Sequence, residues 1–192
     1  MRNSIVKFLA VIGASLWISP AMSGEQFVDK NGVANFGYDV VAYHSTFAAT
    51  LGSSDFQSTY NEAVFYFASE ENRVLFEEQP ETFVPAYDGH CAFALTQHKK
   101  LTIDPEAFSI INPSTNEIHS QSTYSLETPG VLYLNYSPGV NEDFNEDIAD
   151  NIVKANVAWE NCLELKPAAR PKKSFRDLFG GKRPKSCPPV EK

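Results

Sequence analysis

The two ends of the 192-residue chain restrict which residues can form its folded core. Residues 1–7 include two positive charges, the run FLAVIGASLWI is uncharged and apolar, and small residues follow it. This order is typical of a secretory signal peptide, and the apolar run is too short to cross a bilayer. We therefore expect residues 1–23 to be removed by a cut before Gly24 or after Ala21, and the chain to be periplasmic or secreted. A buried N-terminal helix is the alternative.

Charge divides the rest of the chain into an acidic body and a basic tail. Residues 24–165 contain 5 lysines and arginines against 22 aspartates and glutamates, whereas residues 166–192 contain 9 against 2. An acidic body repels nucleic acid, so we do not expect DNA or RNA as a partner. The tail is rich in proline, glycine and lysine, which predicts an extension with little core of its own. It could contact an acidic partner, an anionic surface or the acidic body, or remain solvated.

The first half of the body predicts few regular elements. Residues 27–53 mix glycine and asparagine turns with one short apolar segment, YDVVAY, and predict an irregular arm with a short helical or extended piece. NEAVFYFAS (residues 61–69) is aromatic and β-branched, which predicts a strand. Ser69 can then cap a helix, which Pro80 should end.

The second half of the body predicts strands followed by a helix. HCAFAL (residues 90–95) is a short apolar run suited to a buried strand, and strands are also expected at residues 108–111 and at VLYLNY (131–136). The polar residues 112–130 would then be an unusually long hairpin connection. Apolar residues on one face of residues 141–166 predict a C-terminal amphipathic helix. No later segment after the signal is apolar enough for a membrane helix. The whole pattern favours a small α+β domain over residues 24–165, with an antiparallel sheet covered by helices.

Three cysteines in an exported protein leave one unpaired if a disulfide forms. Cys162 lies at the end of the expected helix and Cys187 lies in the tail. A bridge between them would close a loop of about 25 residues and stabilise the fold by on the order of 3 kcal/mol. Cys91 would then be the free thiol. A Cys91–Cys162 bridge and the absence of any bridge are the alternatives.

Cys91 and its neighbour His90 are the first candidates for chemistry. A thiolate is a nucleophile and a soft ligand for copper or zinc when its pKa is lowered and solvent reaches it. Neighbouring residues on a strand point to opposite faces, so a shared metal would require a turn, which Asp88-Gly89 could supply. A buried structural thiol is the alternative interpretation.

The four histidines have no spacing typical of a metal motif, and the chain contains no CxxC. A metal site would have to be assembled from separate segments. His98 and His119 lie in polar connections, where we expect them to be exposed. His44 follows a core-like segment and is the more interesting candidate, with a structural hydrogen bond as the alternative. The sequence contains no phosphate-binding glycine loop and no GxSxG motif.

Four segments together resemble a known family. These are GYDVVAY (37–43), YFASEENRVLFEEQPETFVPAYDGHCAFAL (66–95), DPEAF (104–108) and VLYLNY (131–136), followed by a helix with Trp159. In this order the chain resembles the exported bacterial YHS domain-containing proteins, which are small α+β proteins. Members of that family can carry selenocysteine where this chain has Cys91. The resemblance therefore implies that this position does more than pack in the core.

The chain departs from the family pattern at several positions. The wider YHS domain is associated with metal binding through cysteines, and the corresponding positions here are Ala68 and Asn72. Zinc-finger-like binding is therefore not supported. Asp88-Gly89-His90 stands where the exported family more often has Gly-Gly-Tyr, and residues 112–130 look like an insertion.

Three functions follow as hypotheses. The first is an exported binding module that holds a transition metal, copper before zinc, through Cys91 with His90 or His44. The second is a thiol-dependent redox protein or enzyme that uses Cys91 as its nucleophile. The third is a structural or interaction module without small-molecule chemistry. Metal binding is favoured over redox chemistry because no resolving cysteine lies near Cys91 in the sequence.

Overall fold

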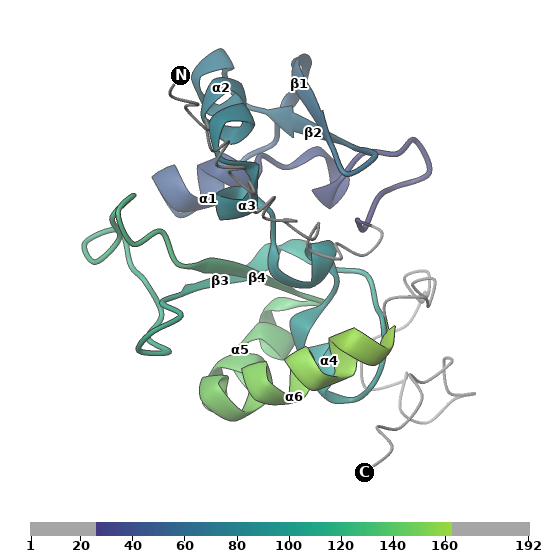
Figure 1. Ribbon diagram of the computed structural model, residues 1–192, viewed down its shortest axis with the longest axis vertical. Coiled ribbons are helices and arrows are strands. Elements are labelled where there is room, and N and C mark those ends of the chain that lie inside the picture. The colour runs from purple at the N-terminus through teal and green to yellow at the C-terminus, as the bar shows by residue number, and fades with distance from the viewer. Residues whose placement is uncertain (1–25, 163–192) are drawn as a thin grey trace, which may run out of the picture.

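A computed structural model describes residues 26–162 of the chain, so the expected signal peptide and basic tail lie outside the described residues. Two hairpins and the helices around them make up this part (Figure 1). The α+β class is thereby confirmed. The antiparallel pairing is divided between two separate two-stranded sheets, one formed by β1 and β2 and the other by β3 and β4.

The first hairpin joins β1 (Ser53–Tyr60) to β2 (Ala63–Phe67). Helices α1 (Val40–Thr46), α2 (Glu70–Glu78) and α3 (Pro80–Phe83) lie beside it, after a short 3-10 turn, η1 (Asn35–Gly37). Strand β2 was expected from its aromatic pattern, but β1 was not, because its sequence SSDFQSTY is mostly polar. Buried rings fill the space between this hairpin and its helices, with Phe65, Phe67 and Phe76 at the centre.

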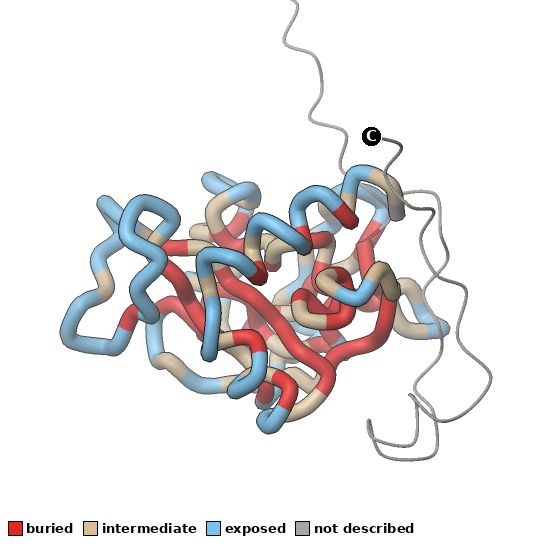
Figure 2. The backbone as a smooth tube through the Cα atoms, turned by 90° about the horizontal axis from the view of Figure 1, so that it is seen from below, coloured by how far each residue is buried: buried red, intermediate tan, exposed pale blue. Residues whose placement is uncertain are grey.

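The second hairpin joins β3 (Asp104–Ile111) to β4 (Val131–Asn135), and residues 112–130 form the long connection predicted from the sequence. Three helices lie on this side of the molecule: α4 (Ala92–Thr96), α5 (Pro138–Glu146) and α6 (Ile148–Cys162). Figure 2 shows buried stretches of backbone inside this part of the chain and exposed stretches at its surface, and four of the five residues of β4 are buried. The hairpin thus forms a central core element that α4 and α5 contact directly.

The C-terminal amphipathic helix is present, but it is divided into α5 and α6. The backbone at Asp147 has φ −141° and ψ 67°, which interrupts the helix between its two parts. Buried Phe144 lies on α5, and Ala155 and Ala158 lie on α6, so both helices turn an apolar face to the core. No helix among residues 26–162 is long and apolar enough to cross a membrane.

The expectation of a strand at residues 90–95 is wrong. A 3-10 turn, η2 (Ala86–Gly89), precedes His90, and helix α4 begins directly after Cys91. A short apolar run is compatible with either a buried strand or a buried helix, so the pattern alone could not separate the two. Here the side chain of Asn135 accepts a hydrogen bond from the backbone N–H of Phe93 at 2.9 Å, which satisfies one of the free donors at the helix start.

The Asp39 side chain links two segments in the first half of the domain by hydrogen bonds. One carboxylate oxygen caps α1 by accepting from the N–H groups of Val41 and Ala42 at 2.8 and 3.1 Å. The other accepts from the Ala68 N–H at 2.8 Å and from the Asn72 side chain at 2.6 Å. The carboxylate therefore links the GYDVVAY segment to the segment that contains SEENR.

Candidate functional site

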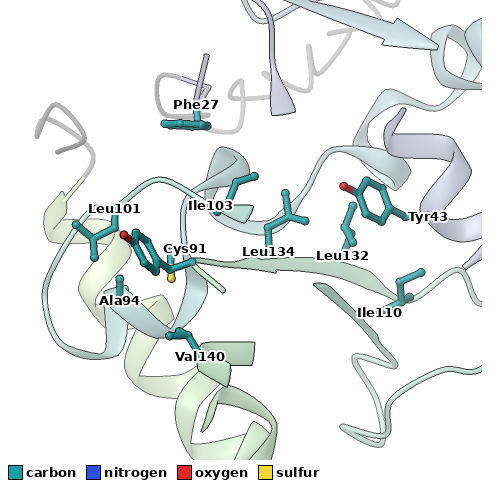
Figure 3. Close-up of a cluster of buried hydrophobic side chains, with 11 residues drawn as sticks. Phe27, Tyr43, Cys91, Ala94, Leu101, Ile103, Ile110, Leu132, Leu134 and Val140 are labelled. Atoms are coloured by element: carbon teal, nitrogen blue, oxygen red, sulfur yellow. The ribbon is translucent and has the colours of Figure 1, made fainter. Parts of the chain in front are cut away.

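Cys91 lies inside a hydrophobic cluster and not on a surface. Its side chain is fully buried, and Figure 3 shows it with Ala94 and Leu101 at one end of the cluster. The sulfur donates to Asn135 Oδ1 at 3.6 Å. Because the amide oxygen can only accept, this contact fits a protonated thiol.

The surroundings of Cys91 favour the neutral thiol. Burial raises the pKa of Cys91 to about 12, although the backbone N–H groups of Ala94, Tyr136 and Phe93 act in the opposite direction. A thiol is a nucleophile or a strong metal ligand only after it loses its proton. In this conformation Cys91 therefore has the properties of a structural thiol.

We predict that Cys91 in the folded protein resists alkylation. Iodoacetamide at pH 8 should label it far more slowly than it labels the urea-unfolded chain, because the sulfur is buried and its pKa is raised. Peptide mass spectrometry gives the rate at Cys91 separately from the other two cysteines. Rapid labelling of Cys91 in the native state, at a pH well below 8.5, would instead support the thiol-enzyme hypothesis.

His90 is also buried, and the contacts that hold its ring are made with residues other than Cys91. Its Nδ1 lies 2.9 Å from the backbone oxygen of Tyr87 and must donate to it, which leaves Nε2 unprotonated in the neutral ring. The imidazole lies between Phe27 and Trp159, with ring centroids 5.5 and 5.6 Å away. Burial first, and then the positive charge of Lys100, lowers the pKa of His90 to about 3.

The same lysine charge disfavours a metal ion at His90. Lys100 Nζ lies 4.9 Å from the centre of the Trp159 ring, against which His90 also packs. A second cation there would be repelled at short range in surroundings of low dielectric constant. No group of three or more histidine, cysteine, aspartate or glutamate side chains in the described residues is arranged to hold a metal ion.

His44 lies apart from Cys91. Its neighbour Tyr43 stands at the opposite end of the cluster from Cys91 in Figure 3. The structure therefore does not bring together the three residues that the sequence suggested as metal ligands. His90 is next to Cys91 in the chain, whereas His44 belongs to a different site.

The environment of His44 is suited to the binding of a metal ion by its ring. Helix α1 carries the ring into the protein, where only 1% of the residue is exposed. Nδ1 lies 3.1 Å from the backbone oxygen of Pro129, and Nε2 is buried without a hydrogen-bond partner among the described residues. Burial lowers the pKa of His44 to about 4, and His119 acts in the same direction, so the ring is neutral at pH 7.

His119 lies beside His44, which the sequence did not predict. We expected His119 to be exposed in the long connection, but it is 9% exposed and its Nε2 is buried without a partner in the described part of the chain. Tyr124 lies against both imidazoles, with ring centroids 5.6 Å from His44 and 5.9 Å from His119. We call His44, His119 and Tyr124 the His44 cluster. His98, also expected to be exposed, is partly buried.

A cleft of about 600 Å³ lies next to this cluster. Helix α3, the start of β4 and both ends of the 112–130 connection line it, including Pro129 and Gly130. The same two residues also contact the histidines: Pro129 accepts the hydrogen bond from His44, and Gly130 packs against His119. The cleft and the His44 cluster thus share one short segment of backbone.

The expected disulfide cannot be placed. Cys162 is the last residue of α6, and its side chain and all of Cys187 lie outside the described residues. The bridge therefore stays a prediction. A comparison of the chain with protein-family models, curated proteins and solved structures finds no match.

Proposed function

We propose that this chain is an exported, YHS-like binding module that holds a transition metal ion through His44, with copper ahead of zinc. The module would bind the ion inside the acidic body, and the basic tail would remain available for an acidic partner or an anionic surface. The proposal keeps the metal-binding function inferred from the sequence. It moves the principal ligand from Cys91 and His90 to His44.

The observation that carries the proposal is the hydrogen bonding of the His44 ring. A backbone oxygen can only accept, so the contact with Pro129 places the proton on Nδ1 and leaves a lone pair on Nε2. Histidines that bind metals are commonly fixed by such a bond from the other ring nitrogen, which sets the tautomer and the ring orientation. Buried Nε2 has no competing partner among the described residues.

The choice of metal follows from ligand chemistry and charge. Imidazole nitrogen suits copper and zinc, and divalent affinity for such ligands is highest for Cu(II). The body carries 22 acidic side chains against 5 basic ones, which favours the approach of cations. A metal ion at His44 would supply a fixed positive charge and open coordination positions.

The proposal predicts that His44→Asn abolishes tight binding. Asparagine can place its amide nitrogen near the Nδ1 position, so it can keep the bond to Pro129 while it removes Nε2. We expect Cu(II) and Zn(II) affinity, measured by isothermal titration, to fall by more than about 100-fold, since the loss of an outer hydrogen-bond partner alone costs about 10–100-fold.

Two matched variants make this experiment specific. In His90, as in His44, Nδ1 bonds a backbone oxygen and Nε2 is buried without a hydrogen-bond partner among the described residues. His90→Asn removes this Nε2, and Cys91→Ala removes the thiol. Both should bind the metals as the wild-type chain does. If His44→Asn binds equally well while either control loses binding, the site lies at Cys91 and His90 and the present assignment is wrong.

A further inference from the structure

Two further donor atoms lie in the His44 cluster, and both come from the 112–130 connection. His119 Nε2 and the Tyr124 hydroxyl are buried and, like His44 Nε2, have no hydrogen-bond partner among residues 26–162. Most buried polar side-chain atoms in proteins are hydrogen-bonded, so three such atoms on rings that pack against one another require an explanation. We infer that His44, His119 and Tyr124 form one metal site with two nitrogen ligands and one oxygen ligand, of which the connection supplies two. This inference rests on the proposed function.

The backbone positions His119 firmly beside His44. The His119 N–H donates to the Ile110 oxygen at 2.7 Å, and Ile118 forms an isolated β-bridge with Ile111, so this part of the connection is held against β3. Helix α1 in turn holds His44, and its first turn is fixed by Asp39.

Gly130 provides the space that His119 occupies. A Cβ atom at this position would lie 2.7 Å from His119 Cδ2 and 3.2 Å from Nε2, and the backbone has φ +66°. Only glycine allows both the left-handed conformation and this approach without strain. The preceding residue, Pro129, binds His44, so one dipeptide contacts both imidazoles.

Two further aromatic rings pack against the His44 cluster. The Phe83 ring lies 5.4 Å from the His44 ring, and the Phe47 ring lies 5.5 Å from the Tyr124 ring. Such an apolar shell limits the access of water to a metal site and strengthens electrostatic interactions inside it. Two imidazoles and a phenol oxygen suit Cu(II) or Zn(II), and the phenol would give up its proton to the solvent when the metal binds.

The test compares three variants of the full chain, with Cu(II) and Zn(II) alone as probes. His119→Asn should lower the affinity for both metals by more than about 100-fold, as His44→Asn does. Tyr124→Phe should keep the ring contacts, weaken binding by about 10-fold and remove the visible absorption that a copper-bound phenolate produces. His98→Asn removes a histidine outside the cluster and should bind like the wild-type chain.

The outcomes separate this inference from the proposed function. Loss of binding in His44→Asn with wild-type binding in His119→Asn and Tyr124→Phe would overturn the three-ligand site and leave the proposed function standing. Wild-type binding in His44→Asn, His119→Asn and Tyr124→Phe alike would overturn both. Electron paramagnetic resonance of the Cu(II)-loaded wild-type chain, with isotope-labelled histidine, gives a reading that does not depend on any variant. Two imidazole nitrogens are expected, and one alone would contradict the site.

Discussion

Replacing Asp39 with alanine should lower the free energy of unfolding by about 4 kcal/mol, because a helix cap is worth about 0.5–2 kcal/mol and each buried donor left without an acceptor costs about 1–3 kcal/mol. The buried carboxylate accepts from four donors on two separate segments of the chain. Urea denaturation followed by circular dichroism measures the change. Asp39→Asn keeps one acceptor oxygen and should fall between the wild type and Asp39→Ala.

Ser69→Ala is the matched control for Asp39. Ser69 caps α2 through a single bond from the Asn72 N–H at 3.3 Å, so its loss should cost about 1 kcal/mol. The difference between the two variants isolates the bonds that Asp39 makes across the fold. Equal losses would mean that Asp39 acts only as a helix cap.

The second large effect is expected at Gly52, next to the start of β1. A Cβ atom there would lie 2.5 Å from the Tyr66 carbonyl carbon and 2.7 Å from the Phe67 nitrogen. Both are backbone atoms of the paired strand, so the two chains would have to separate. Gly52→Ala should therefore lower the free energy of unfolding by about 3 kcal/mol, at the upper end of typical overpacking costs. The same urea denaturation measures it.

Gly139→Ala provides a control of opposite sign. Gly139 lies in helix α5, and an added Cβ would have nothing within 4 Å. Alanine at a helical position should stabilise the protein by roughly 0.5–1 kcal/mol because it restricts the unfolded chain. A neutral Gly52→Ala variant would contradict the close approach of residue 52 to the backbone of residues 66 and 67.

The sequence predicted those features that depend on local signals. Ser69 caps α2 as expected, and the residues on either side of the 112–130 connection pair as a hairpin. In both cases the information lies within a few residues: a capping side chain before a helix, or β-branched runs on either side of turns. The α+β class followed from the same signals.

Features that depend on distant partners were missed. Residues 92–96 are helical, and the start of this helix is capped by Asn135, 42 positions from Phe93 along the chain. His119 is buried because Gly130 leaves it room and because α1 brings His44 to the same place. No spacing in the sequence links His44 to His119, so the candidate site could be assembled only from the fold.

The hydrogen bonds that pass through the Asn135 amide in the second hairpin all run in one donor-to-acceptor direction. The Phe93 N–H can only donate, so Asn135 must turn its oxygen toward α4 and its nitrogen toward Asn141, to which it donates at 2.9 Å. Asn141 in turn donates to the Phe108 oxygen at 3.0 Å. Hydrogen atoms thus point the same way from α4 through β4 and α5 to β3. A carboxylate at position 135 would set an acceptor against the Asn141 oxygen, so deamidation of this one side chain would remove that hydrogen bond and oppose the packing of all four elements.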